Sequence, residues 1–129
     1  MGYLTELLGW KRERQPRVAV RWWVDVQIPR TGHYVGFLTR DISLPGIRLV
    51  GQTCEAFKRV LSEDGQAHMR LRVPGLPQVL PVRAEFKWGI REAGDFLTGW
   101  RFTGMARQVR RALQAYIEAH PEAAVHTPG

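Results

Sequence analysis

Residues 80–102, LPVRAEFKWGIREAGDFLTGWRF, carry the strongest structural pattern in the chain. Side chains suited to a core recur at every second position, which is the period of a β-strand with one buried face. The positions predicted to face inward are Leu80, Val82, Ala84, Phe86, Trp88 and Ile90, then Phe96, Thr98, Trp100 and Phe102. A turn at residues 93–95 separates the two runs, so the stretch predicts a β-hairpin whose large aromatic side chains belong to the core.

The same two-residue period extends through the preceding sequence. It predicts strands over residues 18–26, 34–40, 47–50 and 67–73, whereas residues 51–65 show no regular period. Turn-forming residues, many of them Gly, Pro and Asp, separate these runs. About six strands without crossover helices predict a mainly β domain, an antiparallel barrel or sandwich, because closing the sheet removes its exposed edges.

A helical pattern begins after Gly104 and ends near Pro121. Its apolar stripe is Met105, Val109, Ala112, Leu113, Tyr116 and Ile117, and its solvated face carries Arg107, Arg110 and Arg111. This stripe is expected to cover one open end of the barrel. The organisation expected from these patterns is an N-terminal segment over 1–10, one domain over 11–119 and a flexible tail over 120–129.

The composition limits the classes of function. The chain has 129 residues and a formal net charge of +7, mostly from arginine, which favours an anionic partner or serves only as solubilising charge. A single cysteine, Cys54, excludes an internal disulfide, and the four histidines are too scattered to predict a metal site. No apolar run is long enough to span a bilayer, and the N-terminus does not have the order of a secretory signal, so a cytoplasmic protein is expected. No activated nucleophile, carboxylate pair or phosphate loop is visible, so no enzymatic activity and no cofactor are expected.

The order of the elements resembles the PilZ family over residues 11–118. The most specific match is Asp41-x-Ser43-x-x-Gly46, which has the form of the family's (D/N)xSxxG motif, and GWRF at 99–102 resembles its last strand. The resemblance implies a six-stranded antiparallel β-barrel with a C-terminal helix. It also implies a receptor for the bacterial second messenger cyclic di-GMP, with no catalytic role.

In this family an N-terminal RxxxR arm completes the ligand site. The resemblance assigns its final arginine to Arg17, just before the first strand. Glu13 stands where the family has the first arginine, and Arg12 and Arg14 flank it. We expect Arg12 or Arg14 to take over that position through a small shift of the arm, because an arginine fork binds phosphate or guanine in a bidentate way.

The motif residues suggest separate roles. Asp41 only accepts hydrogen bonds and would suit the N–H groups of guanine, Ser43 donates or accepts, and Gly46 would provide a positive φ or a close backbone approach. The alternative is a polar turn in which Asp41 and Ser43 bond their own backbone. Trp23 shares the outward face with Arg17 and is a candidate for stacking on a base.

Three functions follow from these patterns. The first is a receptor in which cyclic di-GMP orders the arginine arm and signals to a protein partner in motility, pilus or exopolysaccharide machinery. The second, favoured by Glu13, is a ligand-blind PilZ domain that acts only through protein contacts. The third is a small barrel that binds nucleic acid, which ranks last because acidic residues interrupt the basic surface and no basic-aromatic stripe stands out.

Overall fold

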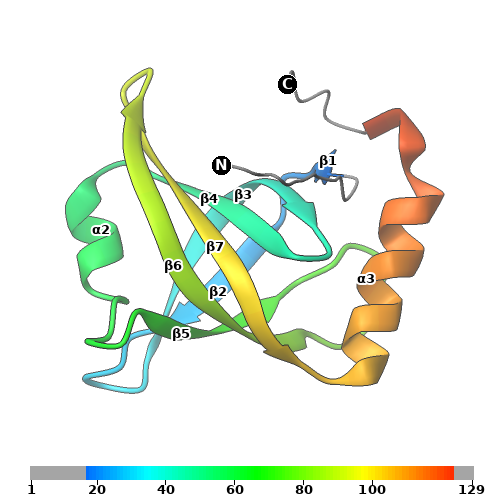
Figure 1. Ribbon diagram of the computed structural model, residues 1–129, viewed down its shortest axis with the longest axis horizontal. Coiled ribbons are helices and arrows are strands. Elements are labelled where there is room, and N and C mark those ends of the chain that lie inside the picture. Colours follow the sequence, from blue (N-terminus) through cyan, green and yellow to red (C-terminus); the bar gives the residue numbers. More distant parts are fainter. Residues whose placement is uncertain (1–16, 124–129) are drawn as a thin grey trace, which may run out of the picture.

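A computed structural model describes residues 17–123 and shows an antiparallel barrel with helices at its two ends (Figure 1). The strands among these residues are β1 (Arg17–Ala19), β2 (Trp23–Gln27), β3 (Tyr34–Ser43), β4 (Gly46–Gly51), β5 (Gln66–Leu71), β6 (Leu80–Glu92) and β7 (Asp95–Met105). The helices are α2 (Cys54–Lys58), α3 (Arg107–Ala119) and the short 3-10 helix η2 (Pro121–Ala123).

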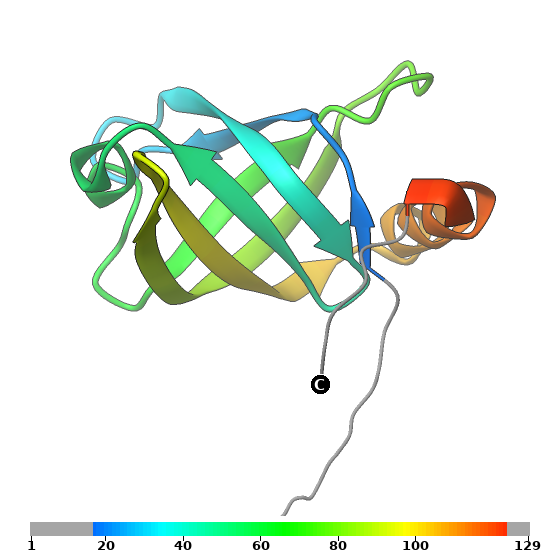
Figure 2. The same cartoon turned by 90° about the horizontal axis from the view of Figure 1, so that it is seen from above.

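Six of the strands form a closed barrel, which Figure 2 shows from the side, with α3 at one end. Their order is β3-β2-β5-β6-β7-β4, and the pairing of β3 with β4 closes the ring. β1 lies outside this ring and pairs only with β3, with Arg17 opposite Ser43 and Ala19 opposite Asp41. The predicted six-stranded antiparallel barrel with a C-terminal helix is therefore confirmed.

The predicted first strand is interrupted in the structure. β1 ends at Ala19 and β2 begins at Trp23, because Thr39 takes the place of a strand partner between them. The Thr39 hydroxyl accepts a hydrogen bond of 2.8 Å from the Trp22 amide and donates one of 2.6 Å to the Val20 carbonyl. The apolar alternation over residues 18–26 does not reveal this break, because the inward-facing and outward-facing positions continue in the same order on both sides of it.

A β-bulge in β6 overturns the prediction that Trp88 and Ile90 face the core. Phe86 pairs with Trp100, but Trp88 pairs with Gly99, so Lys87 is an extra residue in β6. The extra residue reverses the alternation, and the Trp88 and Ile90 side chains are 39% and 48% exposed. The first half of β6 is core, and its second half presents apolar side chains on the outer face.

The other aromatic predictions agree with the structure. Trp22 and Trp100 are buried, and Phe102 packs half-buried against the core. The predicted irregular region contains the short helix α2, whose Phe57 stacks on Phe37 inside the barrel. Cys54, the single cysteine, is half-buried at the start of this helix.

Helix α3 covers one end of the barrel as predicted (Figure 1). Val109, Leu113 and Ile117 are buried on its inner stripe, and the Trp22 and Tyr116 rings meet edge to face. Arg107, Arg110 and Arg111 are exposed on the outer side. No helix in the described part is long and apolar enough to cross a membrane.

The predicted terminal segments are described only in part. η2 lies beside β1, and Ala123 packs against the core, so the predicted flexible tail starts with a folded turn. The predicted N-terminal segment 1–10, the arm residues 11–16 and residues 124–129 lie outside the described residues.

Candidate ligand-binding site

A buried carboxylate that holds two arginines forms the centre of the candidate site. Asp41 is 1% exposed near the end of β3, where the register places it opposite Arg48 of β4. Its Oδ1 accepts hydrogen bonds from Arg17 Nη1 at 2.6 Å and from Arg48 Nε at 2.8 Å. Its Oδ2 accepts a further bond from Arg48 Nη2. A buried carboxylate needs such partners, so Asp41 fixes where both guanidinium groups lie.

The β3–β4 connection is tighter than the sequence predicts. The segment DISLPG was expected to be a turn, but β3 continues to Ser43 and β4 begins at Gly46, so only two residues, 44 and 45, link the strands. Asp41 is therefore a strand residue with a fixed orientation. It does not bond its own backbone, as the polar-turn alternative required, because both its oxygens accept from arginine.

Ser43 and Gly46 shape this connection. The buried Ser43 hydroxyl accepts a bond of 3.3 Å from the Gly46 amide and donates one of 3.2 Å to the Gly46 carbonyl, as in the polar-turn alternative. Gly46 does not have a positive φ, which corrects one of the two roles expected of it. Instead, a Cβ there would lie 2.4 Å from the Trp100 carbonyl oxygen, so glycine permits close pairing with β7.

Next to the two arginines lies a shallow depression of about 170 Å³ on the outer face of the barrel. Its lining is Arg17, Ile47, Arg48, Lys87, Trp88, Gly99 and Trp100. The Trp88 indole lies directly over Gly99, where a Cβ would come within 2.2 Å of the ring. The missing side chain at Gly99 therefore lets a half-exposed tryptophan lie flat beside the cationic groups.

The electrostatic balance of this depression is positive. Arg17, Arg48 and Lys87 contribute three positive charges, and Asp41 contributes one negative charge beneath them. The carboxylate nearest to Lys87 is that of Glu85, 3.8 Å away, and Glu85 also pairs with Arg101 at 2.8 Å. The Arg101 hydrogen bond lowers the pKa of Glu85 and keeps it ionised for this pairing. Cations in excess of carboxylates beside an aromatic face suit an anionic ligand with a planar ring.

The structure brings four of the predicted site residues together. Arg17, Asp41, Ser43 and Gly46 meet around the β3–β4 connection. Arg12 and Arg14 lie outside the described residues, as does Glu13. Trp23 does not line the depression; it is 55% exposed on β2 and lies over Gly36, near Asp25.

Three further residues line the depression but were not predicted as site residues from the sequence, namely Arg48, Lys87 and Trp88. Arg48 could have been found from the sequence, because a short connection between β3 and β4 places it opposite Asp41. Lys87 and Trp88 could not have been found in this way, because their orientation depends on the bulge in β6. Within residues 17–123 no group of three potential metal-ligating side chains is present.

No model of a known protein family matches the chain, and no curated protein matches it in sequence. Solved structures match its fold. The inhibitor of motility MotI (DgrA) from Bacillus subtilis gives a TM-score of 0.70 at 16% identity, over 86% of this chain and 52% of that one. The PilZ domain of YcgR from Escherichia coli, solved with c-di-GMP, gives a TM-score of 0.59 at 17% identity, over 87% of this chain and 97% of that one.

A third structure, the MrkH–c-di-GMP complex from K. pneumonia, gives a TM-score of 0.65 at 18% identity, over 86% of this chain and 52% of MrkH. The chain thus spans about half of MotI and MrkH and nearly all of the isolated YcgR domain. The barrel with its outer strand and terminal helix has the PilZ fold.

Proposed function

We propose that the protein is a receptor that binds cyclic di-GMP in the depression lined by Arg17, Arg48, Lys87 and Trp88. The observation that carries this proposal is the buried Asp41 carboxylate, which aims two arginines at a depression with excess positive charge. The fold supports it, because the similar YcgR and MrkH structures contain c-di-GMP.

The ligand's chemistry matches the lining. Cyclic di-GMP carries two phosphates, and its guanines present the acceptors N7 and O6, which arginine binds in a bidentate way. Among the described residues Arg17 contacts Asp41 through Nη1 only, so within residues 17–123 its Nε and Nη2 have no partner and could donate to a ligand. Trp88 offers a flat apolar face, and base stacking on an aromatic side chain contributes about 1–3 kcal/mol per base.

Asp41 has a positioning role in this proposal. Its oxygens accept three hydrogen bonds from arginine, so its main task is to hold Arg17 and Arg48 in place. Contact between Asp41 and guanine N–H groups stays a prediction, as does the supply of a further cation by Arg12 or Arg14. Ser43 and Gly46 support the site by keeping β3 and β4 in register.

The signal would pass through the N-terminal arm to a protein partner. Arg17 is the first residue of β1, and the arm residues 11–16 precede it directly. A ligand that binds Arg17 would restrict the arm and change the surface that it presents. The partner we expect is a component of motility, pilus or exopolysaccharide machinery. One relative in fold, MotI, is described as an inhibitor of motility.

Isothermal titration with cyclic di-GMP tests the receptor function, with GTP and cyclic di-AMP as controls. We expect selective binding with a Kd in the low micromolar range or tighter. Arg17→Ala or Arg48→Ala should weaken binding about tenfold to a hundredfold, since a hydrogen bond to a charged group contributes roughly 1.5–3 kcal/mol. Arg107→Ala, on the exposed face of α3, is the matched control and should bind like the wild type.

Two results would contradict different parts of the proposal. Absence of binding by the wild type would exclude the receptor function and favour a ligand-blind domain, in line with Glu13. Binding that survives both Arg17→Ala and Arg48→Ala would keep the receptor but exclude this depression as its site.

A further inference from the structure

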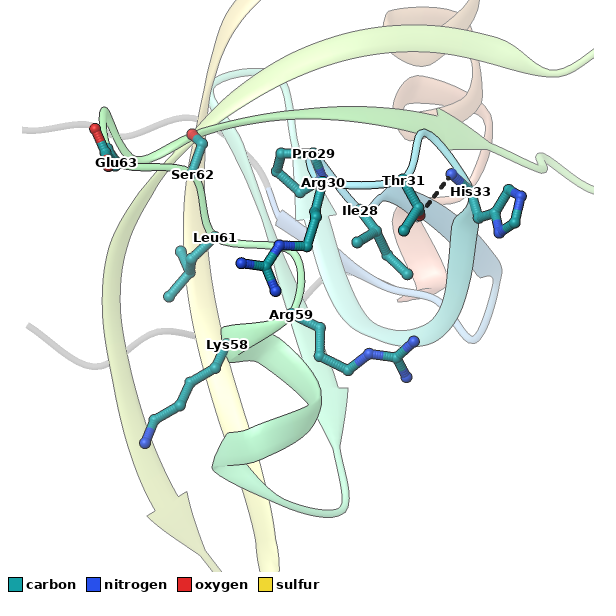
Figure 3. A pocket seen from close by; sticks show the side chains of 10 residues that line it. All are labelled: Ile28, Pro29, Arg30, Thr31, His33, Lys58, Arg59, Leu61, Ser62 and Glu63. Atoms are coloured by element: carbon teal, nitrogen blue, oxygen red, sulfur yellow. Dashed lines mark hydrogen bonds between the residues drawn. The ribbon is translucent and has the colours of Figure 1, made fainter.

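A second and larger cleft lies at the other end of the barrel (Figure 3). It has a volume of about 760 Å³ and lies between the β2–β3 turn, residues 28–33, and the segment 58–63, which begins at the last residue of α2. The β3–β4 connection lies at the α3 end of the barrel, whereas this turn and α2 lie at the opposite end (Figures 1 and 2). The cleft is therefore separate from the candidate cyclic di-GMP site.

The walls of the cleft combine apolar and basic side chains. Ile28, Pro29 and Leu61 form an apolar part, while Arg30, Lys58 and Arg59 are basic and Glu63 is the one carboxylate of the lining. Ile28 is only 8% exposed, so the apolar part is continuous with the core. A ligand for this cleft needs negative charge and an apolar group.

Two of the three cations lack a carboxylate partner in the described part of the chain. Among residues 17–123, the Lys58 ammonium pairs with Glu55 at 3.2 Å, but neither Arg30 nor Arg59 has a carboxylate within 4.0 Å. An added carboxylate would neutralise positive charge that no described carboxylate offsets at these two residues. Arg30 and Arg59 are therefore the residues that an anionic partner would engage.

The arrangement of the cations distinguishes a chain of carboxylates from a single phosphate. Figure 3 shows the Arg30 guanidinium beside Leu61, while the Lys58 and Arg59 side chains extend away from each other. A phosphate site requires donors that converge on one point, and these diverge. Diverging cations along an apolar wall suit an extended peptide with several acidic residues and an apolar side chain between them.

We propose that this cleft binds an acidic, extended segment of a partner protein. The apolar side chain of the segment would contact Leu61 and Pro29, and its carboxylates would pair with Arg30 and Arg59. Because the cleft and the depression share no lining residue, both can be occupied at once. β3 joins them, since it begins at Tyr34 next to the β2–β3 turn and contains Asp41.

Fluorescence anisotropy with a labelled peptide tests this inference. The probe is a decapeptide of Glu and Asp with a central Leu, and the control peptide carries Gln and Asn instead. We expect the wild type to bind the acidic probe and not the control. The double variant Arg30→Glu/Arg59→Glu should weaken binding by about tenfold or more, because each reversal replaces attraction by repulsion.

The matched control is Arg107→Glu/Arg111→Glu, which makes the same change of net charge on the exposed face of α3. It should change the affinity less than twofold. An equal loss in both double variants would overturn the inference, because binding would then reflect only net charge. Absence of binding by the wild type, or displacement of the peptide by an equimolar amount of inorganic pyrophosphate, would overturn it as well.

NMR of the wild type gives a readout that needs no variant. Amide shifts caused by the acidic peptide should concentrate in residues 28–33 and 58–63, and shifts confined to other residues would exclude the cleft. Cyclic di-GMP affinity should be the same in Arg30→Glu/Arg59→Glu as in the wild type. Failure of this inference can therefore be distinguished from failure of the receptor function.

Discussion

Arg48 donates two hydrogen bonds to the carboxylate of Asp41, its partner across the β3–β4 register. The Nε bond measures 2.8 Å, and together with the Nη2 bond it forms a planar fork on the two carboxylate oxygens. Only arginine provides this fork, since the lysine ammonium is a point charge on a flexible stem. The pair therefore links the stability of the strand pairing to the orientation of the proposed site.

Arg48→Lys tests this link. The substitution keeps the charge but loses the fork, and should lower the free energy of unfolding by about 1.5–3 kcal/mol, as expected for a hydrogen bond to a charged group. Urea denaturation measures the change. The matched control is Arg101→Lys, because Arg101 pairs with Glu85 at an exposed position and such pairs contribute about 0–1 kcal/mol. Equal losses in the two variants would mean that burial of Asp41 adds nothing.

Gly99→Ala should displace the Trp88 indole. A Cβ at this position would lie 2.2 Å from the ring, and because Trp88 is 39% exposed its side chain can turn away without disturbing the core. We expect the affinity for cyclic di-GMP to fall about tenfold through loss of stacking. Titration calorimetry measures this fall.

Gly104→Ala in the same strand is the control for that change. Its Cβ would meet only Arg83 Cβ at 3.6 Å, an ordinary contact, so affinity should be unchanged. In a Trp88→Ala background, Gly99→Ala should have no further effect on binding. A further loss in that background would show that Gly99 acts on the ligand independently of Trp88.

Thr39→Val should destabilise the barrel. The change keeps the shape of the side chain but leaves the Trp22 amide and the Val20 carbonyl without their partner, in a position that is 1% exposed. Each buried group left unpaired costs about 1–3 kcal/mol, and thermal and urea unfolding measure the sum. Thr103→Val, which removes an exposed bond to Gln66, should cost little by comparison. A small loss for Thr39→Val would mean that water replaces the hydroxyl.

Ala93→Asn should stabilise the β6–β7 hairpin. Ala93 and Gly94 have φ values of +51° and +87°, the signs of a type I′ turn, in which Asn followed by Gly is favoured. The left-handed backbone costs alanine roughly 1–2 kcal/mol, and we expect recovery of about 0.5–1 kcal/mol in the free energy of unfolding. Ala115→Asn on the exposed face of α3 should act with the opposite sign, since Asn lowers helix propensity.

The local pattern was sufficient to predict most of the strands, the closing helix and a barrel or sandwich, and the PilZ resemblance implied the six-stranded barrel. Alternation of apolar residues follows from the pleat of a strand, and the helical stripe over residues 105–117 follows from its 3.6-residue period. The DxSxxG resemblance also placed Asp41, Ser43 and Gly46 near Arg17, and the structure brings these residues together. The strands and the helix depend on neighbouring residues, so the sequence contains enough information to predict them, whereas the meeting of Arg17 and Asp41, 24 residues apart, was predicted only through the resemblance.

The failures involve partners distant in the chain. The break between β1 and β2 depends on the Thr39 hydroxyl, 17 residues after Trp22. The outward position of Trp88 depends on one extra residue, Lys87, whose effect appears only when β6 is paired with β7. A bulge does not interrupt the apolar alternation in the sequence, so the period alone assigned Trp88 to the wrong face.

Arg17 belongs to the proposed ligand site and is also the first residue of β1, directly after the arm residues 11–16 in the sequence. If the protein acts as proposed, this position of Arg17 makes the binding of cyclic di-GMP and the binding of the partner affect each other reciprocally. A partner that binds the arm in its ligand-bound arrangement must raise the affinity for cyclic di-GMP by some factor. Cyclic di-GMP must then raise the affinity for the partner by the same factor. A partner that binds the arm in another arrangement would lower both affinities. The concentration of the partner would then set the messenger level at which the receptor responds, so the same chain could report different thresholds in cells that contain different amounts of that partner.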